Sequence, residues 1–560
     1  MFVMMMYTRI ALLFLLPCVL LFGLLNCTPN DALHRGECPS TSKTTLLVDL
    51  YHSRKQNHEA YRLTKGNYNY QGVFGYARVM DHLIRNDIQV DSLREKPLTD
   101  VCMMKYDAVF INLLHEDRPN FSDDELQQLQ SYVQQGGGLF VIADHTNVYR
   151  HAERLNPLLK PMGIEVLFST AADTPPSFAI GGNGWIKVFS FETHPVTEAL
   201  QMISLQTGGA FKTDFGVAKS SKSSFADYWD ESDWSGFYGD WKHNGNVALE
   251  PKGPLSVVAA NTWGQGRVVV AGDQNMFGDA WVHVGDNFSL FMNAITWVTK
   301  REKETPHLRD IPFPGLKIGV DMNHSKDAPG QTGPDGFYSF YAHLNRDRDV
   351  QARAIRQFDK KDDVLWLLSP QNTFSSSQRD TIRTYLKDGN TVILSFSSDR
   401  LTAATIQLLH SIAPDFRWET AQKTYTLDTK ADREALLKLR PARIRAALPL
   451  SSELLTDAQK LSLGAAGMEL DLPSSKSPTL LDIRSDWGKP FIQASYEKQT
   501  FDIARRKAVE KGELIIFVQD GFWRSPTLKA KAVEAPGALG QKAVKLLYHL
   551  LDYLKSKHKQ

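Results

Sequence analysis

Uninterrupted apolar segments alternate with amphipathic segments along the first part of the chain. Apolar runs predict buried strands at residues 44–48, 88–90, 108–113 and 139–143. Apolar residues spaced three and four apart predict helices at residues 73–84 and 122–136. Strands that alternate with helices are joined by right-handed crossovers and form a parallel sheet with both faces covered. The pattern predicts an α/β fold with a doubly wound, flavodoxin-like, mainly parallel sheet.

The pattern changes at about residue 164. Up to about residue 261 it is β-rich and irregular, with aromatic residues concentrated at 225–241. Strands are expected again at 255–259 and 267–271, joined by a hairpin turn at Gly264-Gln265-Gly266. A helix at 287–298 then closes the first half, so its sheet is expected to carry a β-rich, aromatic insertion.

The second half of the chain repeats segments of the first half in the same order. The matched segments are 48–54 with 320–326, 122–136 with 375–389, and 268–273 with 515–520. The first pair shares Asp and His at one spacing, as Asp49 with His52 and Asp321 with His324. The second pair shares a serine-capped helix that ends at a glycine. A repeat of about 250 residues has the size of a domain, which predicts two tandem domains of one fold.

Composition sets the expected domain boundaries. Residues 1–27 form a signal-type segment, residues 28–43 a polar tether, and residues 305–315 a proline-punctuated linker. The first domain is expected over residues 44–304. The second domain, a degenerate copy, is expected over residues 316–560.

Charge is nearly balanced across the 560 residues. Lys and Arg number 64 and Asp and Glu number 63, which gives a net charge of +1 with neutral His. Binding to nucleic acid needs a concentrated basic surface. Nucleic acid is therefore not expected as a partner.

The amino-terminal segment predicts export. Arg9 is followed by an apolar run at residues 10–25, a layout typical of a secretory signal. Leu24-Leu25-Asn26-Cys27 resembles a bacterial lipobox, in which Cys27 is lipidated and anchors the mature protein to a membrane. The alternative is an uncleaved amino-terminal anchor. Both interpretations place the globular part outside the cytoplasm, in the periplasm or at the cell surface.

Export also bears on the cysteines, because disulfides persist in oxidising compartments. Cys18 lies within the signal-type segment, which leaves Cys38 and Cys102 as the pair available for a disulfide. The alternative is two unpaired, buried thiols.

Several segments carry a family resemblance: the strand at 107–111, the Gly136-Gly137-Gly138 stop, the strand at 139–144, His194-Pro195-Val196, residues 264–270 and Asp286-Asn287. Together they resemble the class I glutamine-amidotransferase-like superfamily, and within it exported or membrane-associated relatives that lack glutaminase chemistry. Such relatives include modules of gliding-motility transport auxiliaries and domains of intraflagellar transport proteins. The resemblance implies the fold of both halves and says little about function.

The resemblance also implies that glutaminase activity is absent. Members with that activity carry a cysteine nucleophile at the turn after the strand that follows the paired glycines. In this chain the turn reads Asp144-His145-Thr146. Release of ammonia from glutamine is therefore not expected.

Four strand ends of the first domain carry polar residues: Asp49 with His52, His115 with Glu116, Asp144 with His145, and Asp273 with Asn275. They are expected to converge, because ligands of open parallel sheets bind outside the carboxyl ends of the strands. Imidazole and carboxylate groups suit a divalent metal such as zinc, iron or manganese. The expected ligands are Asp144, His145, His115 and Asp49. A metal-bound water could then attack an ester, amide or glycoside.

The structural alternative is that these residues cap helices or satisfy backbone groups. The second domain retains Asp321, His324 and Asp520, whereas serines stand opposite Asp144, His145 and His115. Residues that a degenerate copy retains are expected to serve the fold. The comparison therefore favours the replaced residues as catalytic candidates and weakens the retained ones, including Asp273.

The aromatic stretch places Trp229, Trp234 and Trp241 beside several carboxylates. Aromatic faces next to acidic groups suit stacking on sugar rings or binding of a cationic group. These tryptophans are therefore expected to join the strand-end groups in contacting a ligand. The alternative is a lid whose aromatic residues form a small core of their own.

Three hypotheses follow for the function. The leading one is an anchored envelope protein that binds a ligand or partner, such as a glycan or a transport component, at the strand ends of the first domain. The second is a metal-dependent hydrolase that uses the Asp and His cluster. The third is a structural assembly protein in which neither domain has a working site.

Overall fold

The computed structural model describes most of the chain between residues 43 and 558. The described residues are 43–53, 75–174, 180, 184–229, 238–302, 308–309, 313–358, 360–397, 401–419, 423–438, 443–448, 450–452, 468–473, 482–483, 487–496, 499–528 and 538–558. Within these ranges no helix has the length and apolar character needed to cross a membrane.

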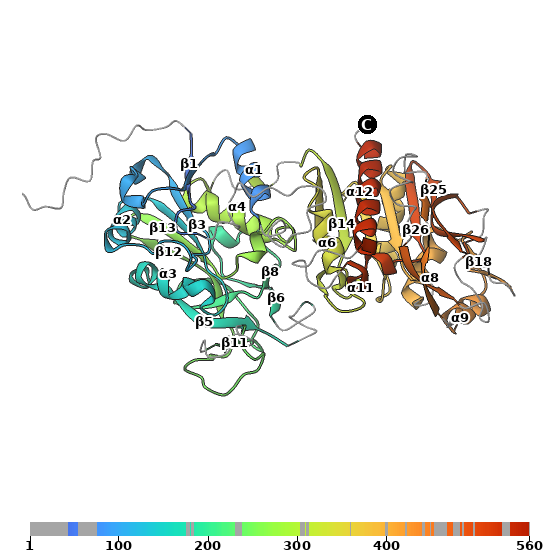
Figure 1. Ribbon diagram of the computed structural model, residues 1–560, viewed down its shortest axis with the longest axis horizontal. Coiled ribbons are helices and arrows are strands. Elements are labelled where there is room, and N and C mark those ends of the chain that lie inside the picture. The colour runs from blue at the N-terminus through green and yellow to red at the C-terminus, as the bar shows by residue number, and fades with distance from the viewer. Residues whose placement is uncertain are drawn as a thin grey trace, which may run out of the picture.

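Domain 1 is built on a sheet in which the five strands at one end are parallel (Figure 1). Their order is β2-β1-β3-β4-β13, with the bounds β1 Thr45–Asp49, β2 Gln89–Leu93, β3 Ala108–Ile111, β4 Gly138–Ile142 and β13 Gly266–Ala271. This is the flavodoxin-like order 2-1-3-4-5, in which the winding reverses between the first and third strands.

Helices cover both faces of this sheet. The four helices are α1 Ala77–Arg85, α2 Asp123–Gln134, α3 His151–Leu159 and α4 Asn287–Val298. α1 and α4 pack on the face that carries Leu46 and Val48, whereas α2 and α3 pack on the face that carries Leu47. The strands are apolar throughout because successive side chains point to opposite faces and both faces are covered.

Beyond β13 the sheet continues with antiparallel strands, in the order β12, β9, β5 and β11. The strands of this region are β5 Glu165–Ala172, β6 Trp185–Val188, β7 Ser190–Phe191, β8 Ile203–Gln206, β9 Gly209–Lys212, β10 Gly216–Lys219, β11 Phe225–Tyr228 and β12 Ser256–Trp263. β12 and β13 form the predicted hairpin, with Gly264 in the left-handed region at its turn (φ +63°). The region is the β-rich insertion that the sequence predicts.

Domain 2 has the same strand order in its parallel part, β15-β14-β16-β17-β26. The bounds are β14 Leu316–Asp321, β15 Val350–Ile355, β16 Val364–Leu368, β17 Thr391–Ser395 and β26 Gly512–Phe517. Antiparallel strands again continue the sheet past the fifth strand: β25 Gln499–Val509, β24 Lys489–Tyr496 and β21 Leu450–Ser452. The predicted α/β fold class with two doubly wound sheets is confirmed.

The helices of domain 2 also cover both faces. They are α6 Tyr338–Leu344, α7 Ser376–Lys387, α8 Ala403–Ile412, α9 Lys430–Lys438, α11 Ser525–Leu528 and α12 Ala538–His558. Smaller strands are β18 Arg417–Glu419, β19 Thr424–Thr426, β20 Arg443–Leu448, β22 Met468–Pro473 and β23 Asp482–Ile483. α6 and α12 pack on the face that carries Trp366 and Leu368, and α7 and α8 on the face that carries Leu365 and Leu367.

The matched helices α2 and α7 start and end alike. The hydroxyls of Ser122 and Ser375 accept the backbone N–H of Glu125 and Gln378, whose side chains accept the serine N–H in return. Each capping box satisfies two N–H groups that the first turn leaves unpaired. Both helices are followed by a glycine in the left-handed region, with φ of +113° and +101°. The repeat therefore extends to the details of the helix ends.

Domain 2 packs against domain 1 through a buried aromatic cluster. Trp281 lies in the loop after β13, and its ring centroid is 4.4 Å from Tyr338 and 5.8 Å from Tyr341, both in α6. Trp185 of β6 lies 5.1 Å from Trp281. Because this loop follows the carboxyl end of β13, domain 2 covers the strand-end side of domain 1.

The same loop extends the sheet of domain 2. Val284 forms an isolated parallel bridge with Ala354 of the edge strand β15, and the N–H of Ala354 donates to the carbonyl of His283 at 3.0 Å. The buried Lys187 of β6 forms an ion pair with Asp327 at 3.0 Å across the same boundary. Separating the domains would leave these buried groups unpaired, which favours one fixed arrangement.

Candidate functional site

The strand ends of domain 1 carry buried polar groups, as the sequence predicts. Asp49 ends β1, Asn112 follows β3, Asp144 follows β4 and Asp273 lies two residues after β13. Parallel strands bring these ends to one edge of the sheet. The candidate residues nevertheless belong to separate networks at and near this edge.

Asp49, His52 and Glu125 form the first network. Asp49 Oδ2 lies 2.8 Å from His52 Nδ1, and Asp49 Oδ1 accepts the N–H of His52 at 3.0 Å. His52 Nε2 lies 3.2 Å from Glu125 Oε1 at the start of α2. Burial acts to raise the pKa of Glu125, but the N–H groups of Ser122 and Leu98 and the charge of His52 bring it below its usual value. The network joins β1 to α2, so we assign it to the fold.

His115 is engaged in different contacts. Its ring stacks on Tyr149 with the centroids 4.3 Å apart, and its Nδ1 lies 3.4 Å from the carboxylate of Asp117. The carbonyl oxygen of the neighbouring Glu116 accepts from Arg154. The expected meeting of His115 with the other strand-end groups does not show in these contacts.

Asp144 and His145 lie buried in the turn after β4. Asp144 Oδ1 accepts the N–H of His145 at 2.8 Å, and the N–H of Asp144 donates to His151 Nε2 at 3.0 Å. Burial lowers the pKa of His151 to about 4, so this ring is neutral at pH 7 and accepts at Nε2. His145 Nδ1 lies 3.0 Å from Thr146 Oγ1, and its ring packs on Tyr238 with centroids 4.6 Å apart.

Asp273 is the centre of another buried network. Its carboxylate accepts the N–H groups of Gln206 and Asn275, each at 2.6 Å, and Asn275 Nδ2 donates to the carbonyl of Gln206 at 3.0 Å. Burial raises the pKa of Asp273, although the N–H groups that it accepts oppose the rise. Burial also raises the pKa of Tyr76, and Asp273 and Asp144 raise it further. The charges of Asp144 and Asp273 therefore both act on this buried phenol.

Aromatic rings close this edge of domain 1. Gln206 Nε2 donates to the hydroxyl of Tyr338 in domain 2 at 2.6 Å. Tyr238 of the insertion packs on His145 and stacks with Trp241, with centroids 6.0 Å apart. Asp49, His52, Asp144, His145, Asp273 and Asn275 are buried, whereas His115 is half-buried and Glu116 is exposed. Tyr338 of domain 2 and Tyr238 of the insertion thus lie over part of this edge, and ligand binding there stays a prediction.

Two of the three candidate tryptophans lie in the described part of the chain. Trp229 is buried, and its N–H donates to the carbonyl of Phe168 at 3.4 Å. Trp241 has a φ of +62°, and its N–H donates to Asp227 at 2.6 Å. Burial raises the pKa of Asp227 to about 7. Trp234 lies outside the described residues, so a ligand role for these tryptophans stays a prediction.

Across the described ranges, no group of three or more His, Cys, Asp or Glu side chains is arranged to hold a metal ion. The expected ligands Asp144, His145, His115 and Asp49 are all described, so the structure does not assemble them as a metal site. The physical reason is that these side chains have other partners. Asp49 binds His52, and His115 stacks on Tyr149.

Cys102 is disulfide-bonded and directly precedes a short 3-10 helix, Met103–Lys105. Its expected partner, Cys38, lies outside the described residues, as does the expected lipidation site Cys27. The Cys38–Cys102 pairing and the lipidation of Cys27 stay predictions.

The strand register corrects one match of the internal repeat. In the repeat, β4 of domain 1 corresponds to β17 of domain 2, residue by residue. Within each sheet, the last residue of this strand lies beside Ala271 in domain 1 and beside Phe517 in domain 2. Ala271 therefore corresponds to Phe517, which is one residue away from the match made on sequence. Gln519 takes the place of Asp273, and Asp520 that of Gln274. The prediction that Asp520 is the counterpart of Asp273 in domain 2 is therefore wrong.

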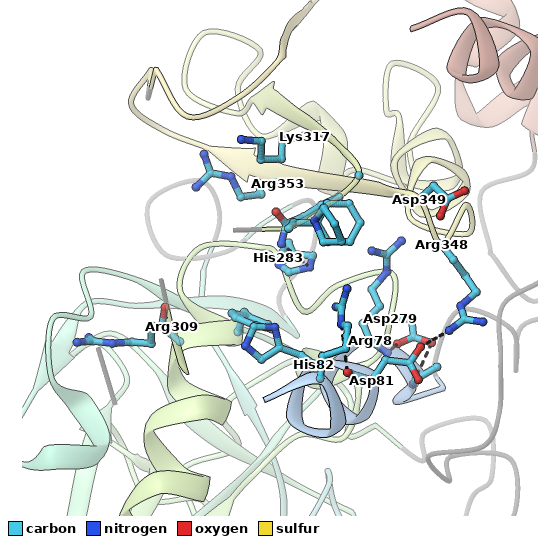
Figure 2. Close-up of a pocket in the computed structure, with 18 of the residues that line it drawn as sticks. Arg78, Asp81, His82, Asp279, His283, Arg309, Lys317, Arg348, Asp349 and Arg353 are labelled. Atoms are coloured by element: carbon cyan, nitrogen blue, oxygen red, sulfur yellow. Dashed lines mark hydrogen bonds and ion pairs between the residues drawn. The ribbon is translucent and has the colours of Figure 1, made fainter. Parts of the chain in front are cut away.

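A large cleft lies between the two domains, with a volume of about 1170 Å³. Its walls come from α1, from residues 279–289, from Arg309 and residues 313–315 of the joining segment, and from the start of domain 2 (Figure 2). No sequence motif marks it, because these segments are far apart in the chain and meet only when both domains are folded.

Two histidines and a phenylalanine lie together in this cleft. The ring of Phe288 is 4.8 Å from that of His82 and 5.2 Å from that of His283. His82 Nε2 lies 2.6 Å from the carbonyl oxygen of Leu308, and His283 Nε2 lies 3.4 Å from Gln351 Nε2 in domain 2. Figure 2 shows His283 between the walls that the two domains contribute.

No family model matches this sequence, and no curated protein sequence matches it. Among solved structures, the mmIFT52 N-terminal domain is 15% identical, with a TM-score of 0.32, over 46% of this chain and 97% of its own. A ThuA-like protein from Bacteroides uniformis is 13% identical, with a TM-score of 0.26, over 46% of this chain and 92% of its own. A β-galactosidase from Bacillus circulans is 11% identical, with a TM-score of 0.25, over 47% of this chain and 34% of its own. Similarities of this size support no inference about activity or ligand.

Proposed function

We propose that this protein is a ligand-binding protein of the cell envelope that takes its ligand in the cleft between its two domains. The observation that carries the proposal is the cleft of about 1170 Å³, whose walls come from both domains and from the segment that joins them. Ligand sites are concave and occur preferentially at domain interfaces. The volume is sufficient for a small organic ligand, since such sites typically measure about 300–1,000 Å³.

Contacts beside the cleft hold its walls in place. Arg78 of α1 donates to the carbonyl oxygens of Asn345 and Asp347 in domain 2, at 2.5 and 2.9 Å. Arg348 of domain 2 forms an ion pair with Asp81 of α1. A ligand would therefore enter a preformed cleft, which reduces the free energy spent on ordering the site.

The strand-end edge of domain 1 supports binding less well. A ligand there would have to displace Tyr338 from Gln206 and Tyr238 from His145, so that buried polar groups would lose their partners. Loss of a buried hydrogen bond costs about 1–3 kcal/mol, whereas the interdomain cleft is already open. The geometry therefore favours the cleft over the crevice that the sequence predicts.

Attachment to a membrane outside the cytoplasm is part of this proposal, and so is a distant relationship to the amidotransferase-like superfamily. The signal-type segment with Cys27 supports the first, and the strand order shared by both domains supports the second. An envelope glycan or transport component is the partner class that export favours. If the lipid anchor is correct, Cys27→Ser will move the protein from the membrane fraction to the soluble fraction.

A ligand screen on the full chain tests the proposed function. Ile84 is 53% exposed on the cleft side of α1, so Ile84→Trp should fill part of the cleft without disturbing the core. The matched control is Gln127→Trp, at an exposed position of α2 on the opposite face of the sheet.

The screen would follow line broadening of neutral, anionic and cationic compounds by NMR. We expect at least one compound that binds the wild type and the Gln127→Trp control but not Ile84→Trp. If every compound that binds the wild type also binds Ile84→Trp, or if no compound binds at all, the cleft is not the functional site.

A further inference from the structure

We infer that the ligand of the interdomain cleft is an anion, a small molecule that carries phosphate or carboxylate groups. This inference rests on the function proposed above, because it names the ligand class for the same cleft. Three features carry it: the excess of cationic side chains in the walls, the partners that already engage the acidic ones, and the placement of Lys317 and Arg353.

Cationic side chains outnumber acidic ones in the walls. Seven Lys and Arg residues line the cleft, against four Asp residues. Asp362 is buried outside the lining and binds Arg353 through both carboxylate oxygens, at 2.8 and 2.9 Å. With Asp362 counted, the excess is still two positive charges. A cleft with low-dielectric walls focuses the field of such an excess and attracts anions.

Three of the four acidic groups in the walls are already engaged. Asp81 forms its ion pair with Arg348. Asp279 accepts two backbone N–H groups at the start of α1, and Asp286 accepts the two backbone N–H groups of residues 201–202. These carboxylates stabilise the fold of the walls. Asp81 forms an ion pair with a cationic side chain of the lining, and the charge of Arg78 also acts on Asp279.

Some of the cations donate their hydrogen bonds to carbonyl oxygens and not to carboxylates. Arg78 donates to two carbonyl oxygens of domain 2, and Arg309 donates to the carbonyl oxygen of Glu198 at 2.9 Å. A carbonyl oxygen fixes the position of a guanidinium group but carries no net charge. Positioned guanidinium groups of this kind are well suited to phosphate and carboxylate oxygens.

Lys317 and Arg353 lie on one face of the domain 2 wall. Lys317 of β14 is paired with Gln351 of β15, and Arg353 lies two residues further along β15. Residues two apart on a strand share a face, so Lys317, Gln351 and Arg353 project to the same side. Figure 2 shows Lys317 and Arg353 close together beside His283. In the described part of the chain, the Lys317 side chain has no ion pair.

The positive charges of the cleft act on the buried ring of His283. Burial lowers its pKa well below the usual value, and the charges of Arg78 and Arg353 lower it further. A cationic form of this ring is therefore opposed by the charges of both walls. The same field favours an anion placed between them.

The cleft also has an apolar side. Ile84 is exposed there, and Phe288 and Phe313 line the same cleft. Apolar surface next to a cationic wall matches a ligand that carries an apolar group beside its charged group. A bare inorganic ion would leave that surface in contact with water.

Isothermal titration calorimetry on the full chain tests the anion class, with inorganic pyrophosphate in one arm, citrate in a second and glucose as the neutral comparison. We expect binding in at least one anion arm and none with glucose. Pyrophosphate alone would indicate a phosphate ligand, and citrate alone a carboxylate ligand. Binding should weaken as salt is raised, because ions screen the attraction.

Two variants locate the anion. Lys317→Gln removes one charge from the wall and should weaken binding about tenfold or more. The matched control, Lys387→Gln, changes an exposed Lys of α7 outside the cleft and should leave affinity unchanged. Equal affinities of the wild type and Lys317→Gln, or anion binding that Ile84→Trp does not weaken, would overturn the inference.

The two proposals fail in distinguishable ways. If the NMR screen finds neutral or cationic compounds that Ile84→Trp excludes while both anions fail to bind, the ligand class is wrong and the cleft remains the site. If no compound of any charge binds the cleft, the proposed function fails and the anion inference fails with it.

Discussion

Domains 1 and 2 each place an Asp–His pair at the end of their first strand, but the third residue that contacts the histidine is charged in domain 1 and neutral in domain 2. In domain 1, His52 lies between the carboxylates of Asp49 and Glu125. In domain 2, His324 lies 3.0 Å from an aspartate carboxylate and 3.2 Å from the amide oxygen of Gln378. Both rings link a strand end to a capped helix. The comparison teaches that the Asp–His pair belongs to the fold, whereas the third partner varies.

The two domains differ more at the end of the fifth parallel strand. In domain 2, Asp520 accepts from Arg524 Nε at 2.9 Å and from Ser369 Oγ at 2.5 Å, so an ion pair closes the strand end within the domain. In domain 1, the carbonyl of Gln274 accepts from the Tyr76 hydroxyl at 2.6 Å. Tyr338 of the other domain completes that edge. Domain 2 is self-contained at this edge, and domain 1 is not.

The largest expected loss of stability comes from replacing His52, and it should exceed the loss from replacing His324. His52→Ala would leave the buried carboxylates of Asp49 and Glu125 without the ring between them, which should lower the free energy of unfolding by about 3–5 kcal/mol. His324→Ala leaves one carboxylate beside a neutral amide and should cost about 2 kcal/mol. Urea denaturation with hydrogen exchange of β1 and β14 would measure each loss. Equal losses would mean that the charge difference between the domains has no energetic consequence.

Arg524→Leu tests the ion pair that closes domain 2. It leaves the buried Asp520 without its cation, and we expect a loss of about 3 kcal/mol in the free energy of unfolding. The control is Arg383→Leu, which breaks an exposed pair with Asp380 and should cost under about 0.5 kcal/mol. Similar losses for the two variants would show that Asp520 does not depend on Arg524.

Glu125→Gln gives His52 of domain 1 the neutral amide partner that His324 has in domain 2. It should lower the free energy of unfolding by about 1–2 kcal/mol at pH 7. The pKa of Glu125 is lowered in the folded state, so its stabilisation is present above the unfolded pKa of about 4.3. That stabilisation is lost as the pH falls through the lower, folded pKa. Glu125→Gln should therefore flatten the acid limb of a stability–pH curve measured from pH 7 to pH 2.

The reciprocal variant sharpens the same test. Gln378→Glu places a carboxylate next to His324 and should add an acid limb to domain 2. If the limb of the wild type survives in Glu125→Gln, its origin lies in other carboxylates.

Tyr76→Phe should have the smallest effect. It removes one buried hydrogen bond to the carbonyl of Gln274. It also makes domain 1 resemble domain 2, because Tyr76 directly precedes α1 as Phe337 directly precedes α6. We expect a loss of about 1 kcal/mol, measured as a shift of the urea midpoint with an unchanged slope. A loss above about 3 kcal/mol would indicate that the phenol supports more of the strand-end edge than this one bond.

Local signals in the sequence were sufficient for the parallel strands of domain 1 and for the helices α1, α2, α4 and α7, whereas α3 and α8 were not predicted. The apolar runs, the capping serines of α2 and α7, the glycines that follow them and the hairpin at Gly264 all act through neighbouring residues. The Asp49–His52 and Asp321–His324 contacts span three residues each, so the same spacing gives the same local geometry in both domains. The roles of the candidate site residues stay predictions. The charges of Asp144 and Asp273 both act on Tyr76, whereas Asp49 contacts His52 and His115 stacks on Tyr149.

The sequence by itself determined two flavodoxin-like domains and their helix ends, because hydrophobic period and capping are local properties. Only the tertiary structure decided the register of β26, the closure of domain 1 by Tyr338 and the cationic cleft between the domains. Shifting the alignment of β26 with β13 by one residue leaves the apolar pattern of the strand unchanged. It nevertheless places Gln519, and not Asp520, at the position of Asp273. The cleft depends on Arg78 and Lys317, which are brought to one cavity only by the packing of one folded domain on the other.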